Sequence, residues 1–153
     1  MKPPIPSSDA FWILSSAYRD AGDAVLDKVR AESYTGFAVL PCVFSYFRSI
    51  ELGLKAVLTC FDVPEQEITR TLGHRISNLL EKTETLLALS EIGVLADDRK
   101  LLDHYSDDYS GKWFEYPDTF WDEYPNLEEL KEIAHRVCDT IQHYKRKKRQ
   151  HIK

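Results

Sequence analysis

The stretch FAVLPCVFSYFRSIELGLKAVLTCF, residues 37–61, constrains the fold more than any other part of the chain. Large apolar residues recur through it every three or four positions, which places their side chains on one face of an α-helix. Pro41 falls near the start of this pattern and is expected either in the first turn, where a helix tolerates proline, or at a kink. The apolar face is wide enough for a central bundle helix; it consists of Phe44, Phe47, Ile50, Leu54, Val57, Leu58 and Phe61.

The same periodicity predicts further helices on both sides of this one. We expect them over residues 8–31, within 73–93, over 96–106 and from Asn126 onward. No segment alternates apolar and polar residues as a strand does, and the sequence has no glycine-rich phosphate loop. The sequence therefore predicts an all-α fold, a bundle of four to five helices in one domain covering residues 1–153.

The helix within 73–93 has candidate start and stop signals. Thr69 or Thr71 is expected to cap its beginning, because a threonine hydroxyl can accept a hydrogen bond from a free N–H of the first turn. Gly93 is expected to end it, since glycine readily adopts the left-handed conformation that follows many helices.

An aromatic segment, SGKWFEYPDTFW at residues 110–121, interrupts the helical pattern before the last helix. Its proline rules out a regular helix through the segment. We expect an irregular aromatic strap that lays Trp113, Phe114 and Tyr116 over the bundle, where each ring buries a large apolar area. The alternative is that these rings stack on a ligand.

Charge is distributed unevenly along the chain. The first 143 residues hold 14 basic and 25 acidic side chains, a net charge of −11, whereas residues 144–153 hold six basic side chains and no acid. We regard residues 144–153 as a basic C-terminal tail. Such a tail either docks on nucleic-acid phosphates or is a solvated helix end whose cations interact favourably with the negative end of the helix dipole.

Other sequence features concern location and cofactors. The N-terminal residues lack the continuous apolar stretch of a signal peptide, and nothing later resembles a membrane span, so we expect a cytoplasmic protein without membrane contact. Cys42, Cys60 and Cys138 are odd in number and far apart, which fits neither a disulfide framework nor a paired metal site. We expect buried or half-buried thiols, no metal site and no cofactor.

Glu51 is the most informative polar residue of the central helix. Lys55 lies four residues after it and therefore on the same face, and Arg48 lies three residues before it. At about 100° per residue, Glu51 is expected at the rim of the core, where a carboxylate needs a partner. Lys55, Arg48 or His74 can supply one. The cluster is either a structural ion pair that fixes helix packing or part of a site.

Three stretches, SIELGLKAVL, LGHRISNLL and YSGKWFEYPD, occur in this order before a last helix. This combination resembles the HEPN superfamily of helical domains over about residues 36–145. The tyrosine-proline element resembles a (K/R)YP-type segment of some of these proteins, with Glu115 where a basic residue is common. The resemblance implies an α-helical bundle, frequent homodimerisation, and roles around nucleotides or RNA in defence, toxin and stress systems.

The resemblance also implies a possible activity. Catalytic HEPN proteins are metal-independent ribonucleases that use an Arg and a His separated by four to six residues, usually paired across a dimer. Arg136 and His143, in HRVCDTIQHY, match this spacing at its upper limit. Residues seven apart lie nearly on one helix face, so the two side chains are expected to point the same way.

Three functions are consistent with these features. The one we favour is a non-catalytic HEPN-like binding or regulatory module, linked to a nucleotide, an RNA or a partner protein. Its expected ligand-binding residues are Glu51, Lys55, His74, Lys112 and Tyr116. The first alternative is a metal-independent ribonuclease acting through Arg136 and His143, and the second is a dimeric structural scaffold.

Overall fold

The computed structural model describes residues 8–111 and 124–151, and all regular structure in these residues is helical. The described residues form five α-helices: α1 (Ser8–Ala31), α2 (Leu40–Cys60), α3 (Ile76–Glu84), α4 (Ala96–Ser110) and α5 (Leu127–His151). Short 3-10 helices cover Gly36–Val39 and Leu89–Ile92, and a π-helix covers Glu67–Leu72. The predicted all-α class is therefore confirmed. The aromatic strap lies outside the described residues.

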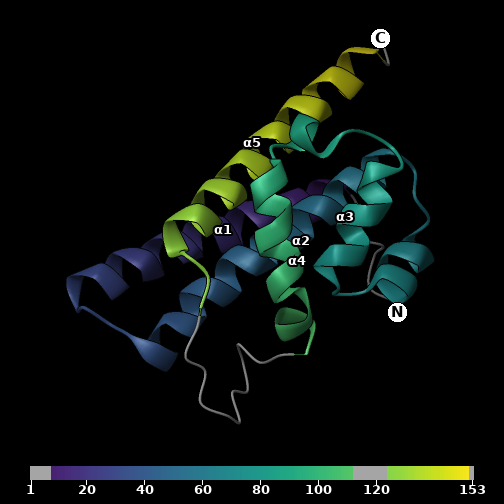
Figure 1. The fold of residues 1–153 in the computed structure, drawn as a ribbon. Helices are drawn as coiled ribbons and strands as arrows, with labels where there is room; N and C mark the ends of the chain where they lie inside the picture. Colours follow the sequence, from purple (N-terminus) through teal and green to yellow (C-terminus); the bar gives the residue numbers. More distant parts are fainter. Residues whose placement is uncertain (1–7, 112–123, 152–153) are drawn as a thin grey trace, which may run out of the picture.

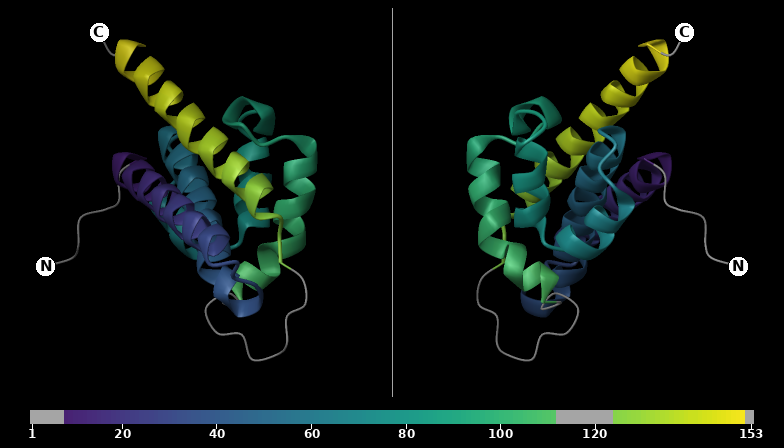
Figure 2. Two further views of the ribbon diagram at one scale, coloured as in Figure 1. Left: turned by 90° about the vertical axis from the view of Figure 1, so that its left-hand side faces the viewer. Right: turned by 90° about the vertical axis from the view of Figure 1, so that its right-hand side faces the viewer.

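Helix α2 occupies the centre of the bundle (Figure 1). It packs against α1 and α5 on one side and against α3 on the other, and α4 covers α3. The two side views show α5 running diagonally past α1 and α2, with its C-terminal end extending beyond the other helices (Figure 2). The apolar side chains facing α2 form one continuous core.

The sequence of α2 explains its central place. Tyr46, Phe47, Ile50 and Leu54 are fully buried, and Pro41 lies in the first turn, the first of the two positions expected for it. Phe61, by contrast, lies beyond the helix end and is 41% exposed.

The segment Gly36–Cys60 is long and apolar enough to cross a membrane by length and composition, contrary to the expectation that nothing in the chain resembles a membrane span. In this structure 72% of its most apolar window is buried inside the protein, as in the core helix of a bundle.

The helix predicted within 73–93 is interrupted. Gly73 adopts a φ of +58°, which ends the π-helix Glu67–Leu72, and α3 begins only at Ile76. The predicted caps are wrong, because Arg75 precedes α3 without a side-chain cap, and the Thr69 hydroxyl instead donates to the Glu65 carbonyl. The predicted stop is wrong for α3, which ends at Glu84; Gly93, with a φ of +80°, ends the separate 3-10 helix Leu89–Ile92.

The remaining helix boundaries agree closely with the prediction. Helix α1 covers the predicted range, and α4 is one turn longer than expected. Helix α5 begins after Asn126, whose side-chain oxygen accepts hydrogen bonds from the N–H groups of Glu128 and Glu129. This is an N-cap, which compensates the unpaired donors of the first turn.

Candidate functional site

Glu51 lies at the centre of a buried charged cluster between α2 and α4. Its side chain is fully buried, deeper than the rim position predicted. Lys55 Nζ lies 2.6 Å from Glu51 Oε1, and Arg48 Nη1 lies 2.9 Å from Oε2. The helical spacing therefore pairs the carboxylate with both expected cations. A buried carboxylate needs such partners because losing its hydration is costly.

Tyr109 completes the cluster from the last turn of α4. Its hydroxyl donates a hydrogen bond to Glu51 Oε2, and its ring stacks on Phe47 with centroids 5.5 Å apart. This residue was not predicted from the sequence. The available signal was the four-residue spacing of Tyr105 and Tyr109, which places two aromatic rings on the inner face of α4.

Electrostatics in the cluster follow from burial and from the paired charges. Burial alone would raise the pKa of Glu51, but the charges of Lys55 and Arg48, with hydrogen bonds from Lys55 and Tyr109, hold that pKa below its ordinary value. Burial and the neighbouring carboxylate raise the pKa of Tyr109. Glu51 is therefore ionised and Tyr109 is a neutral donor at physiological pH.

His74 connects this cluster to the surface. Its Nδ1 lies 2.8 Å from Glu51 Oε1 and 3.3 Å from Arg48 Nη1. An ionised carboxylate only accepts hydrogen bonds, so His74 Nδ1 carries the proton, and Nε2 is the lone-pair nitrogen when the ring is neutral. The side chain is 61% exposed, so the imidazole ring that Glu51 orients is accessible from solvent. We call Arg48, Glu51, Lys55, His74 and Tyr109 the Glu51 cluster.

A pocket of about 480 Å³ lies beside His74. One wall is the turn that joins the π-helix to α3, and the other is the end of α4. The lining residues are Arg70, Thr71, Leu72, Gly73, His74, Arg75, Asp107, Ser110 and Gly111. Arg70 and Arg75 carry positive charge, and the carboxylate of Asp107 lies 3.9 Å from Arg75. Two guanidinium groups and an imidazole therefore share the pocket with one carboxylate.

The structure does not bring all predicted site residues together. Glu51, Lys55 and His74 meet in the Glu51 cluster. Lys112 and Tyr116 lie outside the described residues.

The residues of the ribonuclease alternative lie on α5. Arg136 Nη2 is 3.0 Å from Asp98 Oδ2, and the Arg136 backbone and Cβ pack against Gly93. His143 is exposed, two helical turns further along. Seven residues correspond to a rise of about 10 Å, so one phosphate reaches both side chains only if they extend toward it.

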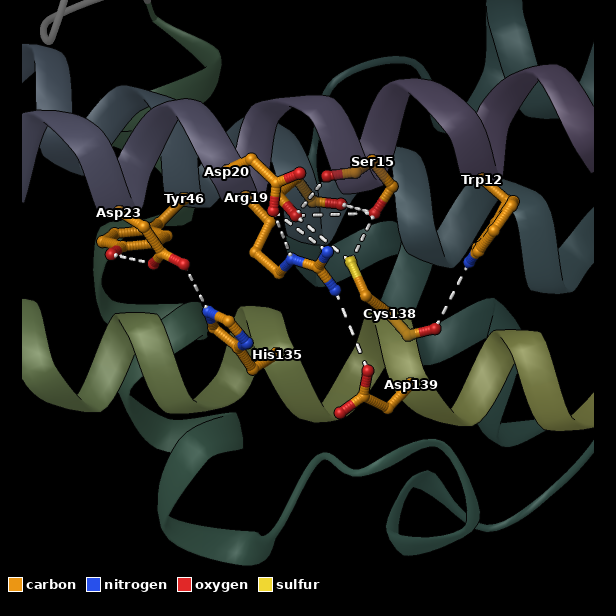
Figure 3. A network of polar contacts seen from close by, with 10 residues as sticks. Trp12, Ser15, Arg19, Asp20, Asp23, Tyr46, His135, Cys138 and Asp139 are labelled. Atoms are coloured by element: carbon orange, nitrogen blue, oxygen red, sulfur yellow. Dashed lines mark hydrogen bonds and ion pairs between the residues drawn. The ribbon is translucent and has the colours of Figure 1, made fainter.

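A second polar network, the α1–α5 seam, joins α1 to α2 and α5 (Figure 3). Its members are Trp12, Ser15, Arg19, Asp20, Asp23, Tyr46, Ser49, His135, Cys138 and Asp139. Tyr46 Oη donates to Asp23 at 2.7 Å, and His135 Nε2 lies 2.8 Å from the same carboxylate. Ser15 Oγ donates to the Ser49 carbonyl at 2.7 Å and lies 3.2 Å from Cys138 Sγ. None of these residues lines the pocket.

The cysteines and possible metal ligands add no further site. Cys42 and Cys138 are buried free thiols and Cys60 is partly buried, as predicted. Burial raises the pKa of Cys42 to about 11, so it is an unreactive thiol. Within residues 8–111 and 124–151, no group of three or more His, Cys, Asp or Glu side chains is arranged to hold a metal ion. Comparison with protein-family models, curated proteins and solved structures found no match.

Proposed function

We propose that this protein is a HEPN-like, non-catalytic binding module that holds the phosphate group of a nucleotide in the pocket beside His74. The supporting observation is the lining, in which Arg70, Arg75 and His74 surround a space with one carboxylate. Arginine suits this role because its planar guanidinium donates two parallel hydrogen bonds to phosphate oxygens. The proposal includes a cytoplasmic homodimer, which light scattering can test.

The Glu51 cluster supports the same ligand class. Glu51 contributes one negative charge, and Arg48 and Lys55 contribute two positive charges, so the group behind His74 is net positive. Gly73 and Gly111 leave the pocket walls without side chains at two positions, which lets a ligand approach the backbone. An anion is favoured in such a pocket, and an uncharged nucleoside gains much less from it.

Calorimetric titration with adenosine 5′-monophosphate and with adenosine tests this proposal. We expect the monophosphate to bind and the nucleoside to bind at least about tenfold more weakly, since one charge-assisted contact is worth about 1.4 kcal/mol or more. The double variant Arg70→Gln with Arg75→Gln should lose monophosphate binding. A matched control, Lys28→Gln with Arg30→Gln, removes the same charge from exposed positions of α1.

Two outcomes contradict the proposal. One is equal loss of binding in the control variant, which would mean that net charge and not the pocket attracts the ligand. The other is a folded wild-type protein that binds neither compound, which would leave the dimeric scaffold as the better description.

A further inference from the structure

The last described turns of α5 extend beyond the bundle (Figures 1 and 2). Among the side chains of this helix that the structure describes, Ile141 is the last fully buried one and Tyr144 is the last that packs against the core. The helix continues to His151. Seven residues at 1.5 Å each extend about 10 Å past Tyr144. This end of the helix therefore projects beyond the other helices of the bundle.

The sequence of this extension is strongly basic. Residues 145–149 are KRKKR, and no acidic residue follows Asp139. Successive helical positions are rotated by about 100°, so five consecutive basic positions cover the whole circumference. A surface helix that packs on one partner normally carries its specific residues on one face. Charge on every side fits a partner that surrounds the helix with negative groups.

We propose that this projecting end of α5 docks in the major groove of duplex DNA and contacts backbone phosphates without reading the base sequence. The groove of B-form DNA is about 12 Å wide and admits an α-helix, and phosphates then flank the helix on both sides. The major groove of duplex RNA is too narrow for this geometry. A membrane surface fits poorly, because residues 145–151, KRKKRQH, have no apolar face to insert.

The acidic body of the protein explains why contact is confined to this end. The first 143 residues carry a net charge of −11, and α4 presents Asp97, Asp98, Asp103 and Asp107. Electrostatic repulsion is screened over about 8 Å at physiological ionic strength. An extension of about 10 Å therefore lets phosphates approach the basic helix while the body remains about one screening length away.

Fluorescence anisotropy with a labelled duplex DNA of about 20 base pairs tests the proposal. We expect binding that weakens steeply between 50 and 200 mM NaCl, with a slope of log K against log salt between about −2.7 and −4.5 for three to five phosphate contacts. The triple variant Lys145→Gln, Lys147→Gln and Lys148→Gln should reduce the magnitude of this slope by about 2.7.

A matched triple variant, Lys28→Gln, Lys100→Gln and Lys131→Gln, makes the same change in net charge on α1, on α4 and at the start of α5. It should leave the slope within about one unit of the wild-type value, since it removes no phosphate contact. Circular dichroism checks that both variants remain helical.

Separate arms use duplex RNA, single-stranded RNA and vesicles with anionic lipid. Tighter binding to any of these than to duplex DNA overturns the proposal, as does no binding to DNA at 50 mM NaCl or an equal loss in the control variant. The proposal does not depend on the nucleotide pocket. We therefore expect the Arg70→Gln, Arg75→Gln variant to bind duplex DNA as the wild type does.

Discussion

The Glu51 cluster and the α1–α5 seam are both polar networks between the helices of an apolar bundle, but they differ in what lies beyond them. In the seam, Ser15, Asp23 and His135 bond to residues of neighbouring helices, so its polarity joins helix to helix. In the Glu51 cluster, His74 is 61% exposed and lines a pocket with two arginines. The two networks therefore differ in access: the Glu51 cluster is connected through His74 to a pocket at the surface, and this connection makes it the candidate site.

The two regions also differ in packing. A Cβ atom on Gly53 would lie 2.6 Å from Val137 Cγ1, and one on Gly22 would lie 2.7 Å from the Tyr46 ring. Glycine therefore allows α2 to approach α5 and α1 closely at the seam. On the opposite side of α2, charges and rings fill the space toward α4. We expect the seam to respond most to added volume and the Glu51 cluster to lost charge.

The largest effect is expected from Glu51→Ala. This change leaves Lys55 buried without its partner, and breaking a buried ion pair in this way costs about 3–5 kcal/mol of unfolding free energy. Urea denaturation measures the loss. The double variant Glu51→Leu with Lys55→Leu removes both partners and should recover part of it. If the unfolding free energy of Glu51→Ala lies within about 1 kcal/mol of the wild-type value, water hydrates the cluster and the expectation is wrong.

A smaller effect, about 1–3 kcal/mol, is expected from Gly53→Ala, because the added methyl group overpacks the contact with Val137. Alanine favours a helix by about 1 kcal/mol over glycine, so net destabilisation would show that the clash outweighs this helix preference. The double variant Gly53→Ala with Val137→Ala should be less unstable than the sum of the two single changes. Additive effects in this cycle would mean that the helices shift apart at little cost.

Acid pH compares the two networks through their carboxylates. The folded pKa of Glu51 lies below 4.5 and that of Asp23 below 3.8, their ordinary values. Each carboxylate therefore stabilises the fold above its ordinary pKa, and this contribution is lost as pH falls through the lower folded value. Urea titrations from pH 7 to 2 should show a flatter acid limb for Glu51→Gln than for Asp23→Asn, because Glu51 is fully buried against the charges of Arg48 and Lys55, whereas Asp23 is partly exposed beside His135. The reverse order would make the seam the stronger electrostatic element.

The sequence predicted the features that depend only on residues close together in one helix. The apolar spacing predicted α1 and α2, and the three- and four-residue spacings predicted Arg48 and Lys55 as partners of Glu51. Those pairs need only one continuous helix to form. The prediction that His74 could reach Glu51 is also confirmed.

The parts that sequence did not predict depend on how separate helices dock. Tyr109 is 58 residues from Glu51, and its contact exists only after α4 packs near α2. The pocket depends on the turn at Gly73, whose positive φ separates the π-helix from α3 and leaves Arg70 and Arg75 on one wall. A periodic pattern predicts that a helix exists, but it contains little information about such a turn.

The smallest structural effect is expected from His143→Ala, which changes an exposed side chain and should alter stability by less than about 0.5 kcal/mol. The variant is informative because it tests whether the protein has ribonuclease activity. If the pocket near His74 is the functional region, wild-type protein should not cleave RNA in the presence of EDTA, and the variant should match it. Arg136→Ala is the companion change, with a loss of up to about 1 kcal/mol from the Asp98 ion pair.

Cleavage by wild type that both substitutions abolish, with fold and oligomeric state preserved, would move the functional region from the pocket beside His74 to the exposed face of α5. General acid–base chemistry by His143 and charge stabilisation by Arg136 would then occur on α5. Arg136 already bonds to Asp98, so a phosphate would have to compete with that carboxylate for the guanidinium. The same competition makes the variant Asp98→Asn informative: it should raise cleavage if Arg136 is catalytic and leave it absent if the α5 face is only solvated.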